Sequence, residues 1–319
     1  MATGIASQPI HETPVAIIDF ETTGLTAGAD RVIEVSVVRV DPGQEPCLVL
    51  DTLVNPHRHV AATEIHGITD ADVENAPYFH EIAGELLGVL EGCVLAAYNV
   101  YFDIKFLNFE MANAGIEHEP PHFCLMYMRP LLGLGSRCKL QEACRHHGIN
   151  YDATHIAAQD ALASGQLLKC YLDELHRQQI RTYNDLTRLR NYRFLKSFVN
   201  DPFPSPSAFD LSGCDHLWSR VGHVHETVVD PTHKAIREYW DTLKTVVADL
   251  KITDEELRYV VAERNRLGLA KEQIRVLHAR AFANAIAQFC DDEWLDDKEL
   301  TKLRRLHQCL STLGWAPGQ

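Results

Sequence analysis

The stretch VAIIDFETTGL, residues 15–25, joins a hydrophobic run to two acidic side chains. Its first four residues are apolar, and Asp19 and Glu21 follow with only Phe20 between them. Successive side chains of a β-strand point to opposite faces, so Asp19 and Glu21 share one face and Phe20 takes the other. An isolated ionised carboxylate in a low-dielectric interior is costly. The stretch therefore predicts a buried strand whose end carries two acids that need a shared partner.

The segments around this stretch predict a mixed sheet. Runs rich in β-branched residues at 32–41 and 47–56 are separated by turn-forming residues and favour antiparallel strands. Short apolar runs then alternate with segments of helical periodicity. The later strands are expected at 94–99 and 122–128, and the helices at 78–92, 101–115, 139–148 and 157–178. We expect an α/β fold with a five-stranded mixed sheet flanked by helices, followed by a smaller all-helical domain.

The rest of the chain predicts a connecting segment and a helical domain. Residues 179–209 interleave basic and aromatic side chains and end in a Pro/Ser cluster that is typical of a linker. Such side chains can bind single-stranded nucleic acid, although a solvated connecting helix is the simpler explanation. Two acidic helix starts, in 249–269 and 292–310, either cap their helices or form a cation site. We expect domains at 1–178 and 210–319, joined by 179–209.

Composition limits the classes of protein that the chain can belong to. It has 319 residues, 46% of them hydrophobic, which is enough for a full core and more consistent with two domains than one. Residues 1–14 lack a signal-like apolar region, and no apolar run is long enough to span a membrane. Nine cysteines without a CxxC pair favour reduced thiols and a cytoplasmic protein. The net charge of -14 opposes binding of nucleic acid by a basic surface, unless bound cations mediate the contact.

Other acidic residues can complete a cation site with Asp19 and Glu21. Asp103 follows the apolar run 94–99 at the start of a predicted helix, and Asp160 lies in the first turn of a long one. We place His155 on the loop just before that helix, where it can fold over the site. A separate group, Cys214, His216, His223 and His225, has the residue types of zinc ligation without a regular finger spacing.

Three segments resemble the motifs of the DEDDh family, the ribonuclease-H-like 3′–5′ exonucleases that include the proofreading epsilon subunit of bacterial DNA polymerase III. The segments are DFETTG at 19–24, YNVYFDIKFL at 98–107 and HIAAQDA at 155–161. Their order and spacing match the family over about residues 13–178. One departure is Tyr98, which stands where the second motif usually has His. We expect altered contacts to the substrate and retained catalysis.

The resemblance implies a role for each matching position. Asp19, Glu21, Asp103 and Asp160 match the metal-binding carboxylates, and His155 matches the general base. The positions expected to contact the 3′-terminal nucleotide are Thr22, Thr23, Gly24, Leu25, His66, Ile68 and Asn99. Two divalent cations, Mg²⁺ or Mn²⁺, are the expected cofactors, because both prefer oxygen ligands.

We therefore expect a 3′–5′ exonuclease that acts on single-stranded or 3′-terminal nucleic acid, with DNA favoured over RNA. Two alternatives are an exoribonuclease of the same fold and a catalytically idle binding module. Residues 210–319 resemble a tellurite-resistance TerB-like helical domain, which implies a metal-binding or interaction role and a possible protein partner.

Overall fold

The computed structural model describes residues 4–25, 27–60, 63–151, 156–209, 211, 235–236, 238–240, 242–243, 246, 253–289 and 297–315. The chain forms two compact units. The first contains Met1–Thr23, Arg31–Val60 and Ile68–His225, and the second contains Gly24–Asp30, Ala61–Gly67 and Glu226–Gln319. Among the described residues, no helix is both long and apolar enough to cross a membrane.

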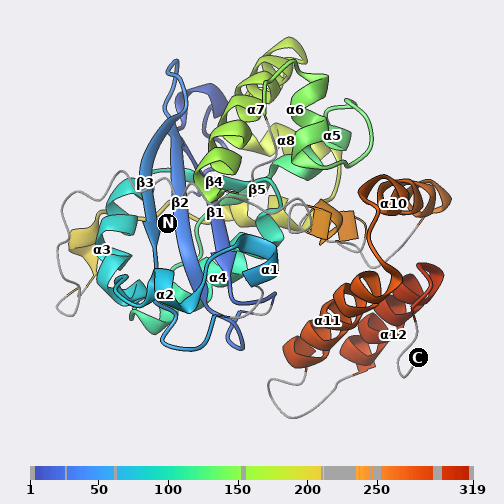
Figure 1. Ribbon diagram of the computed structural model, residues 1–319. Helices are drawn as coiled ribbons and strands as arrows, with labels where there is room; N and C mark the ends of the chain where they lie inside the picture. The colour runs from blue at the N-terminus through green and yellow to red at the C-terminus, as the bar shows by residue number, and fades with distance from the viewer. Residues whose placement is uncertain are drawn as a thin grey trace. The chain divides into compact units, whose positions relative to one another are not determined.

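A five-stranded mixed sheet forms the centre of the first unit (Figure 1). Its strands are β1 (Val15–Thr22), β2 (Val32–Val40), β3 (Cys47–Leu53), β4 (Val94–Ala97) and β5 (His122–Cys124). They are ordered β3-β2-β1-β4-β5. The pairs β1–β2 and β2–β3 are antiparallel, and β1–β4 and β4–β5 are parallel. The predicted α/β class and mixed five-stranded sheet are confirmed.

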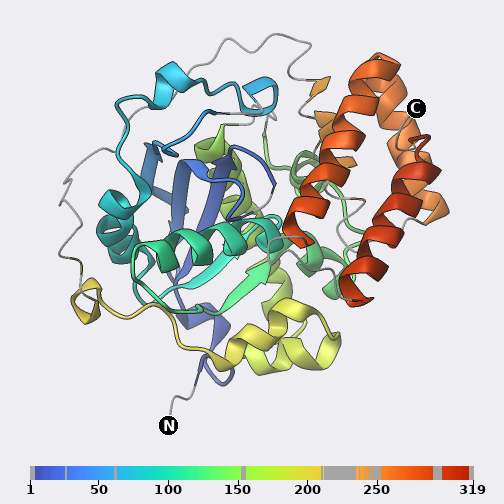
Figure 2. The same cartoon turned by 90° about the horizontal axis from the view of Figure 1, so that it is seen from below.

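Helices cover both faces of this sheet. Those of the first unit are α2 (Asp70–Val73), α3 (Phe79–Leu90), α4 (Val100–Asn113), α5 (Leu125–Leu131), α6 (Leu140–His146), α7 (Ala157–Arg177) and α8 (Tyr183–Leu189). Arg39 of β2 donates from Nη1 to the Val89 carbonyl of α3 at 3.3 Å, whereas the neighbouring Val38 points toward α7. Because neighbouring residues of a strand face opposite ways, α3 and α7 lie on opposite faces. Figure 2 shows α4 running across the front of the sheet.

The prediction of a strand over 122–128 is wrong beyond Cys124. The last ladder pair joins Ala97 of β4 to Cys124, and β4 ends there. Backbone groups beyond the end of a ladder need other partners. Residues from Leu125 onward find them inside α5, and the Met126 amide donates to the Tyr98 carbonyl at 3.0 Å.

The connecting segment packs into the core of the first unit. It contains α8 and two 3₁₀ helices, η2 (Arg193–Val199) and η3 (Pro206–Ala208). A third 3₁₀ helix, η1 (Ile10–Glu12), lies near the start of the first unit. Phe194 and Phe198 are fully buried. Ser197 Oγ accepts from the His122 amide at 2.9 Å and donates to its carbonyl at 3.0 Å. Most apolar side chains of this segment are therefore core residues, although Leu189 and Val199 are exposed, and its basic side chains remain on the surface.

The second unit contains α1 (Thr63–His66), α10 (Asp254–Leu267), α11 (Lys271–Phe289) and α12 (Asp297–Thr312). Its core includes Tyr239, Trp240, Leu277 and Trp315. At the start of α10, Thr253 and Glu256 form a reciprocal capping box. Capping therefore accounts for Glu256 in the first of the two acidic starts. The second start falls largely on 290–296, outside the described residues, and the TerB-like resemblance stays a prediction.

Candidate active site

Strand β1 loses its neighbour on one side before it reaches its two acids. Its pairing with β4 covers only Val15 to Ile17, while its pairing with β2 continues to Thr22. The register with β2 shifts between Glu21 and Thr22, which is a bulge at the acidic end of the strand. Bulges are common next to active sites because they redirect side chains. The strand end is therefore open on the side where β4 stops.

Asp103 fills this open edge of β1. It lies in the first turn of α4, which starts directly after β4, and its side chain is buried. Its Oδ1 accepts a hydrogen bond from the Phe20 amide at 3.1 Å. Because Phe20 separates Asp19 from Glu21 in the chain, this contact brings a third carboxylate to the backbone between them. Asp103 is thus held against the backbone of β1 at its acidic end, and its sharing of a cation with Asp19 and Glu21 stays a prediction.

A buried ion pair anchors α4 against the start of β2. Arg31 binds Glu110 of α4 through both Nε and Nη2, each at 2.7 Å, and Glu110 also accepts from the Val32 amide at 3.2 Å. The Glu110 side chain is 1% exposed. Two bonds between Thr23 and Arg31 close the loop between β1 and β2. This pair was not predicted, because no local pattern links residues 79 positions apart.

Helix α7 covers the face of the sheet that carries Asp19 and Glu21. A Cβ at Gly165 would come within 3.2 Å of a Val38 methyl carbon, so α7 approaches β2 closely at this point. Val38 is the cross-strand partner of Ile17. Cross-strand partners share a face, and so do residues two apart on one strand. Ile17, Asp19 and Glu21 therefore all lie on the α7 side.

The direction of α7 brings Asp160 toward the acidic end of β1. Later in the helix, Lys169 forms an ion pair with Glu45, which precedes β3. Glu45 lies in the turn that follows β2, close to the last residue of that strand, Val40. Val40 pairs with Val15, the first residue of β1, so Glu45 marks the start of β1. Helix α7 therefore runs antiparallel to β1, and its first turn, with Asp160, lies toward the two acids.

Tyr151 orients the Asp160 carboxylate. Its hydroxyl donates to Asp160 Oδ1 at 2.5 Å. A hydrogen bond to a carboxylate stabilises its ionised form and fixes its direction. Tyr151 was not predicted as a site residue, although it lies four residues before the third motif. His155 lies outside the described residues, so its role as a base stays a prediction.

More acids line the same face than the motifs suggest. Ser36 of β2 is the partner of Asp19 on one side and of Asp51 on the other, and its hydroxyl donates to Asp51 Oδ1 at 2.6 Å. Burial raises the pKa of Asp51, and the bond from Ser36 partly opposes this shift. Glu34, also buried, is the cross-strand partner of Glu21. Both acids could have been found from their alternation with apolar residues in the strands.

Asn99 and Tyr98 lie where β4 leads into α4. Asn99 is the N-cap residue of α4, and its buried Oδ1 has no hydrogen-bond partner among the described residues. A buried acceptor without a protein partner is costly unless a water, an ion or a ligand binds it. The Tyr98 hydroxyl donates to the Cys138 carbonyl at 2.5 Å. Burial raises the pKa of Tyr98 well above its ordinary value, so the phenol stays protonated.

The other predicted nucleotide contacts fall in both units. Thr22 and Thr23 are buried at the end of β1. Ile68 packs in a small cluster with Ile33, Val60 and Val73. Gly24, Leu25 and the buried His66 belong to the second unit. A Cβ at Gly24 would come within 2.4 Å of the Asp30 carboxylate, which explains the glycine.

The candidate zinc ligands at 214–225 lie outside the described residues. Their role also stays a prediction.

Comparison with known proteins identifies the class of the first unit. The Exonuclease family matches residues 16–168. DNA polymerase III subunit epsilon of Treponema pallidum is 33% identical over 159 residues, which cover 48% of this chain and 74% of that protein. The match therefore covers most of that subunit and places an exonuclease domain in the first unit. The chain belongs to the DnaQ-like DEDDh exonuclease family, as a homologue of DNA polymerase III subunit epsilon.

Longer relatives match the chain over part of their length. A DNA polymerase III subunit epsilon-like protein of Rhodobacter capsulatus is 30% identical over 204 residues, 61% of this chain and 29% of the relative. DNA polymerase III PolC-type of Thermotoga maritima is 30% identical over 192 residues, 57% of this chain and 14% of the relative. The chain thus spans less than a third of either protein.

Two solved structures are also similar to the chain. Exonuclease X in complex with 5′ overhanging duplex DNA has a TM-score of 0.43 and 23% identity, over 55% of this chain and 99% of that one. The nuclease domain of 3′hExo, a DEDDh family member bound to rAMP, has a TM-score of 0.41 and 17% identity, over 53% of this chain and 94% of that one.

Proposed function

We propose that the chain is a divalent-cation-dependent 3′–5′ exonuclease that hydrolyses phosphodiester bonds at DNA 3′ ends. The observation that supports the proposal is the bond from the Phe20 amide to Asp103 Oδ1, which holds the Asp103 carboxylate against the backbone between Asp19 and Glu21. The antiparallel run of α7 adds Asp160 to the same end of β1. In this proposal, the motif carboxylates of β1, α4 and α7 form one cation site.

The donor set suits a hard divalent cation. Asp19, Glu21, Asp103 and Asp160 offer only carboxylate oxygens, which Mg²⁺ and Mn²⁺ prefer over nitrogen or sulfur. Carboxylates at one strand end repel one another unless a cation compensates them. When bound, two such cations stabilise charge on the attacking and leaving oxygens of a phosphoryl transfer.

The protein residues then position the 3′ end and move the proton. The Asn99 carboxamide oxygen can accept a hydrogen bond from the terminal nucleotide, which would satisfy this buried group. His155 acts as the general base, because an unperturbed imidazole has a pKa near ~6.5 and can take a proton from water at neutral pH. The water oxygen bonds to phosphorus as the bond from phosphorus to the 3′ oxygen breaks, and the 3′ oxygen takes up a proton from solvent. The products are a strand shortened by one nucleotide with a 3′ hydroxyl and a nucleoside 5′-monophosphate.

Matched oligonucleotides test this proposal. We expect hydrolysis of single-stranded DNA with a free 3′ hydroxyl, loss of activity with a blocked 3′ end or with chelator, and slower hydrolysis of the matched RNA. Asp19→Asn should lower the rate at least about 10³-fold, or ~4 kcal/mol of transition-state stabilisation. The matched control Glu91→Gln changes an exposed acid and should leave the rate unchanged.

Each other outcome contradicts part of the proposal. Faster hydrolysis of RNA would identify an exoribonuclease. Binding of DNA without hydrolysis at any cation concentration would identify an idle binding module.

A further inference from the structure

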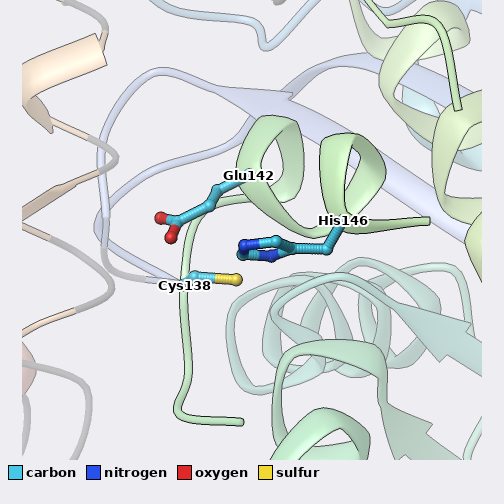
Figure 3. Close-up of side chains that lie close together, drawn as sticks. All are labelled: Cys138, Glu142 and His146. Carbon is cyan, nitrogen blue, oxygen red and sulfur yellow. The ribbon is translucent and has the colours of Figure 1, made fainter. Parts of the chain in front are cut away.

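Cys138, Glu142 and His146 form a cluster of metal-ligating side chains that the proposed exonuclease chemistry does not use (Figure 3). Their ligand atoms, one sulfur, one carboxylate oxygen and one imidazole nitrogen, all lie within 4.8 Å of one another. Figure 3 shows Glu142 and His146 on one helix and Cys138 on the segment before it. The cluster thus brings together three different donor atoms.

The local structure brings these three side chains to one side of α6. Glu142 and His146 are four residues apart in α6, so their side chains lie on the same helix face. Cys138 lies just before Lys139, the N-cap residue of α6. The three side chains are therefore spaced four residues apart, with Cys138 just before the helix and the other two within it.

Cys138 is the fixed member of the cluster. Its side chain is buried, at 6% exposed, and its carbonyl accepts the hydrogen bond from the Tyr98 hydroxyl. Two residues earlier, the Ser136 carbonyl accepts from Arg129 Nε at 3.0 Å, which holds the same segment. Glu142 is half-buried and His146 is exposed, so these two side chains are freer to change rotamer.

The donor set fits a zinc-class ion rather than Mg²⁺. Thiolate and imidazole are ligands that Zn²⁺ prefers, and its bond lengths of about 2.0 to 2.3 Å space tetrahedral ligand atoms about 3.4 to 3.6 Å apart. The cluster must therefore close by about 1 Å around an ion of this class. Rotation about the side-chain bonds of Glu142 and His146 can supply this movement, while Cys138 stays in place.

The charges around the cluster also permit a cation. Burial raises the pKa of the Cys138 thiol to about 11, against the opposing effect of Arg129 and Arg145. The thiol is thus protonated before an ion binds. Formation of the sulfur–metal bond releases this proton to solvent, and the thiolate and Glu142 then supply two negative charges. These charges offset the repulsion between the ion and the two arginines.

We propose that Cys138, Glu142 and His146 bind one Zn²⁺-class cation, with a fourth position open to solvent. This site is separate in residues and in chemistry from the four carboxylates, and it does not depend on the exonuclease proposal. A bound ion would fix the segment before α6 to α6 itself. Because Tyr98 binds that segment, the ion would also stabilise the end of β4.

Cobalt substitution of the reduced full-length chain tests the site. Co²⁺ bound to a thiolate gives a near-ultraviolet charge-transfer band, which an all-carboxylate site cannot produce. We expect this band at one equivalent of Co²⁺ in excess Mg²⁺, and its loss on addition of Zn²⁺. Cys138→Ser should abolish the band. Glu142→Gln and His146→Gln should each weaken Co²⁺ binding at least about 100-fold, the upper end of the effect of removing an outer partner.

Matched variants separate this site from other thiols and from the carboxylates. Cys47→Ser removes an exposed cysteine and should keep the band. Asp19→Asn should also keep it, even though this variant is expected to lose nuclease activity. If Cys138→Ser does not fold, the Glu142 and His146 variants still decide the question. No band in the wild type, or a band unchanged in these two variants, would overturn the proposal.

Discussion

At the scale of single residues, the Asp103 carboxylate shows how a backbone contact sets the candidate site. It accepts a hydrogen bond from the Phe20 amide, which is available because β4 pairs with β1 only as far as Ile17. Asp103→Asn keeps the shape of the side chain and removes its charge. We expect the variant to fold with an unchanged melting temperature but to need a higher Mn²⁺ concentration, and to lose at least about 10²-fold in rate. A titration of activity against Mn²⁺ measures both effects, and an unchanged titration would remove Asp103 from the cation site.

Tyr151 gives a second prediction at this scale. Tyr151→Phe removes the hydroxyl that donates to Asp160 Oδ1. A hydrogen bond to a charged group contributes about 1.5 to 3 kcal/mol, so we expect a rate about 10-fold to 100-fold lower at limiting cation. Excess cation should partly restore the rate, since Asp160 itself is intact. Tyr78→Phe, at an exposed tyrosine, is the matched control. Equal rates for both variants would show that Tyr151 does not position Asp160.

The sequence predicts the acids of the site better than their supports. Asp19 and Glu21 can be recognised in the sequence as charges at the end of an apolar strand, and Asp160 can be recognised as an acid in the first turn of a long helix. Glu110, Arg31 and Tyr151 have no such signal, because their partners lie elsewhere in the chain or are ordinary surface residue types. Their roles depend on tertiary contacts that a local pattern does not contain.

At the scale of elements, the ion pair between Arg31 and Glu110 connects α4 to β2. Removing one partner of a buried pair leaves the other charge without compensation and costs about 3 to 5 kcal/mol. Since Arg31 is partly exposed, we expect Glu110→Gln to lower the free energy of unfolding by ~3 kcal/mol, near the lower end of this range. Urea denaturation followed by circular dichroism measures this change. Glu85→Gln, on α3, is the control, and a loss no larger than its own would contradict the prediction.

The buried His278 on α11 makes the helices of the second unit sensitive to acid. Its Nε2 lies 2.9 Å from the Tyr239 hydroxyl. Burial, and then the charge of Arg264, lower the pKa of His278 to about 4. The unfolded chain takes up this proton near pH ~6.5, while the folded chain does not. The free energy of unfolding is therefore constant above this pH and falls as the pH drops toward 4, by about 2 kcal/mol at pH ~5.

Tryptophan fluorescence can follow this transition, because Trp240 and Trp315 both lie in the core of the second unit. We expect thermal melts to shift downward between pH ~7.5 and ~5 in the wild type, and to shift less in His278→Phe, where no imidazole titrates. An equal shift in both proteins would assign the acid sensitivity to other groups.

Element type was predictable from periodicity, but element ends were not. The first four strands fall within the predicted runs, because each is a run of apolar and β-branched residues. The run 122–128 is apolar throughout and fits a buried strand or a buried helix equally well. Whether these residues form a strand depends on the end of β4, which a local pattern does not contain. Because β4 ends at Ala97, β5 has only three residues.

At the scale of the whole molecule, the boundary of the catalytic unit can be tested by truncation. We expect residues 1–209 to fold alone and to hydrolyse short oligonucleotides, because the four acids and the packed connecting segment precede residue 210. A chain that ends at 178 lacks Phe194 and Phe198, which are 1% exposed in the full chain. Loss of one buried Phe side chain costs about 3 to 5 kcal/mol, and a domain has only ~5 to 15 kcal/mol in total.

The shorter truncation should therefore aggregate or melt far below the longer one, although every motif residue is present in both. Thermal melts and single-turnover rates on the same two preparations separate stability from catalysis. The variant Phe198→Ala in the longer truncation is the intermediate case, with a melting temperature between the two. If residues 1–178 melt at the same temperature as 1–209, the connecting segment is not part of the core. If residues 1–209 fold but hydrolyse nothing while the full chain is active, catalysis needs a contribution from 210–319, and the proposed division of the chain fails.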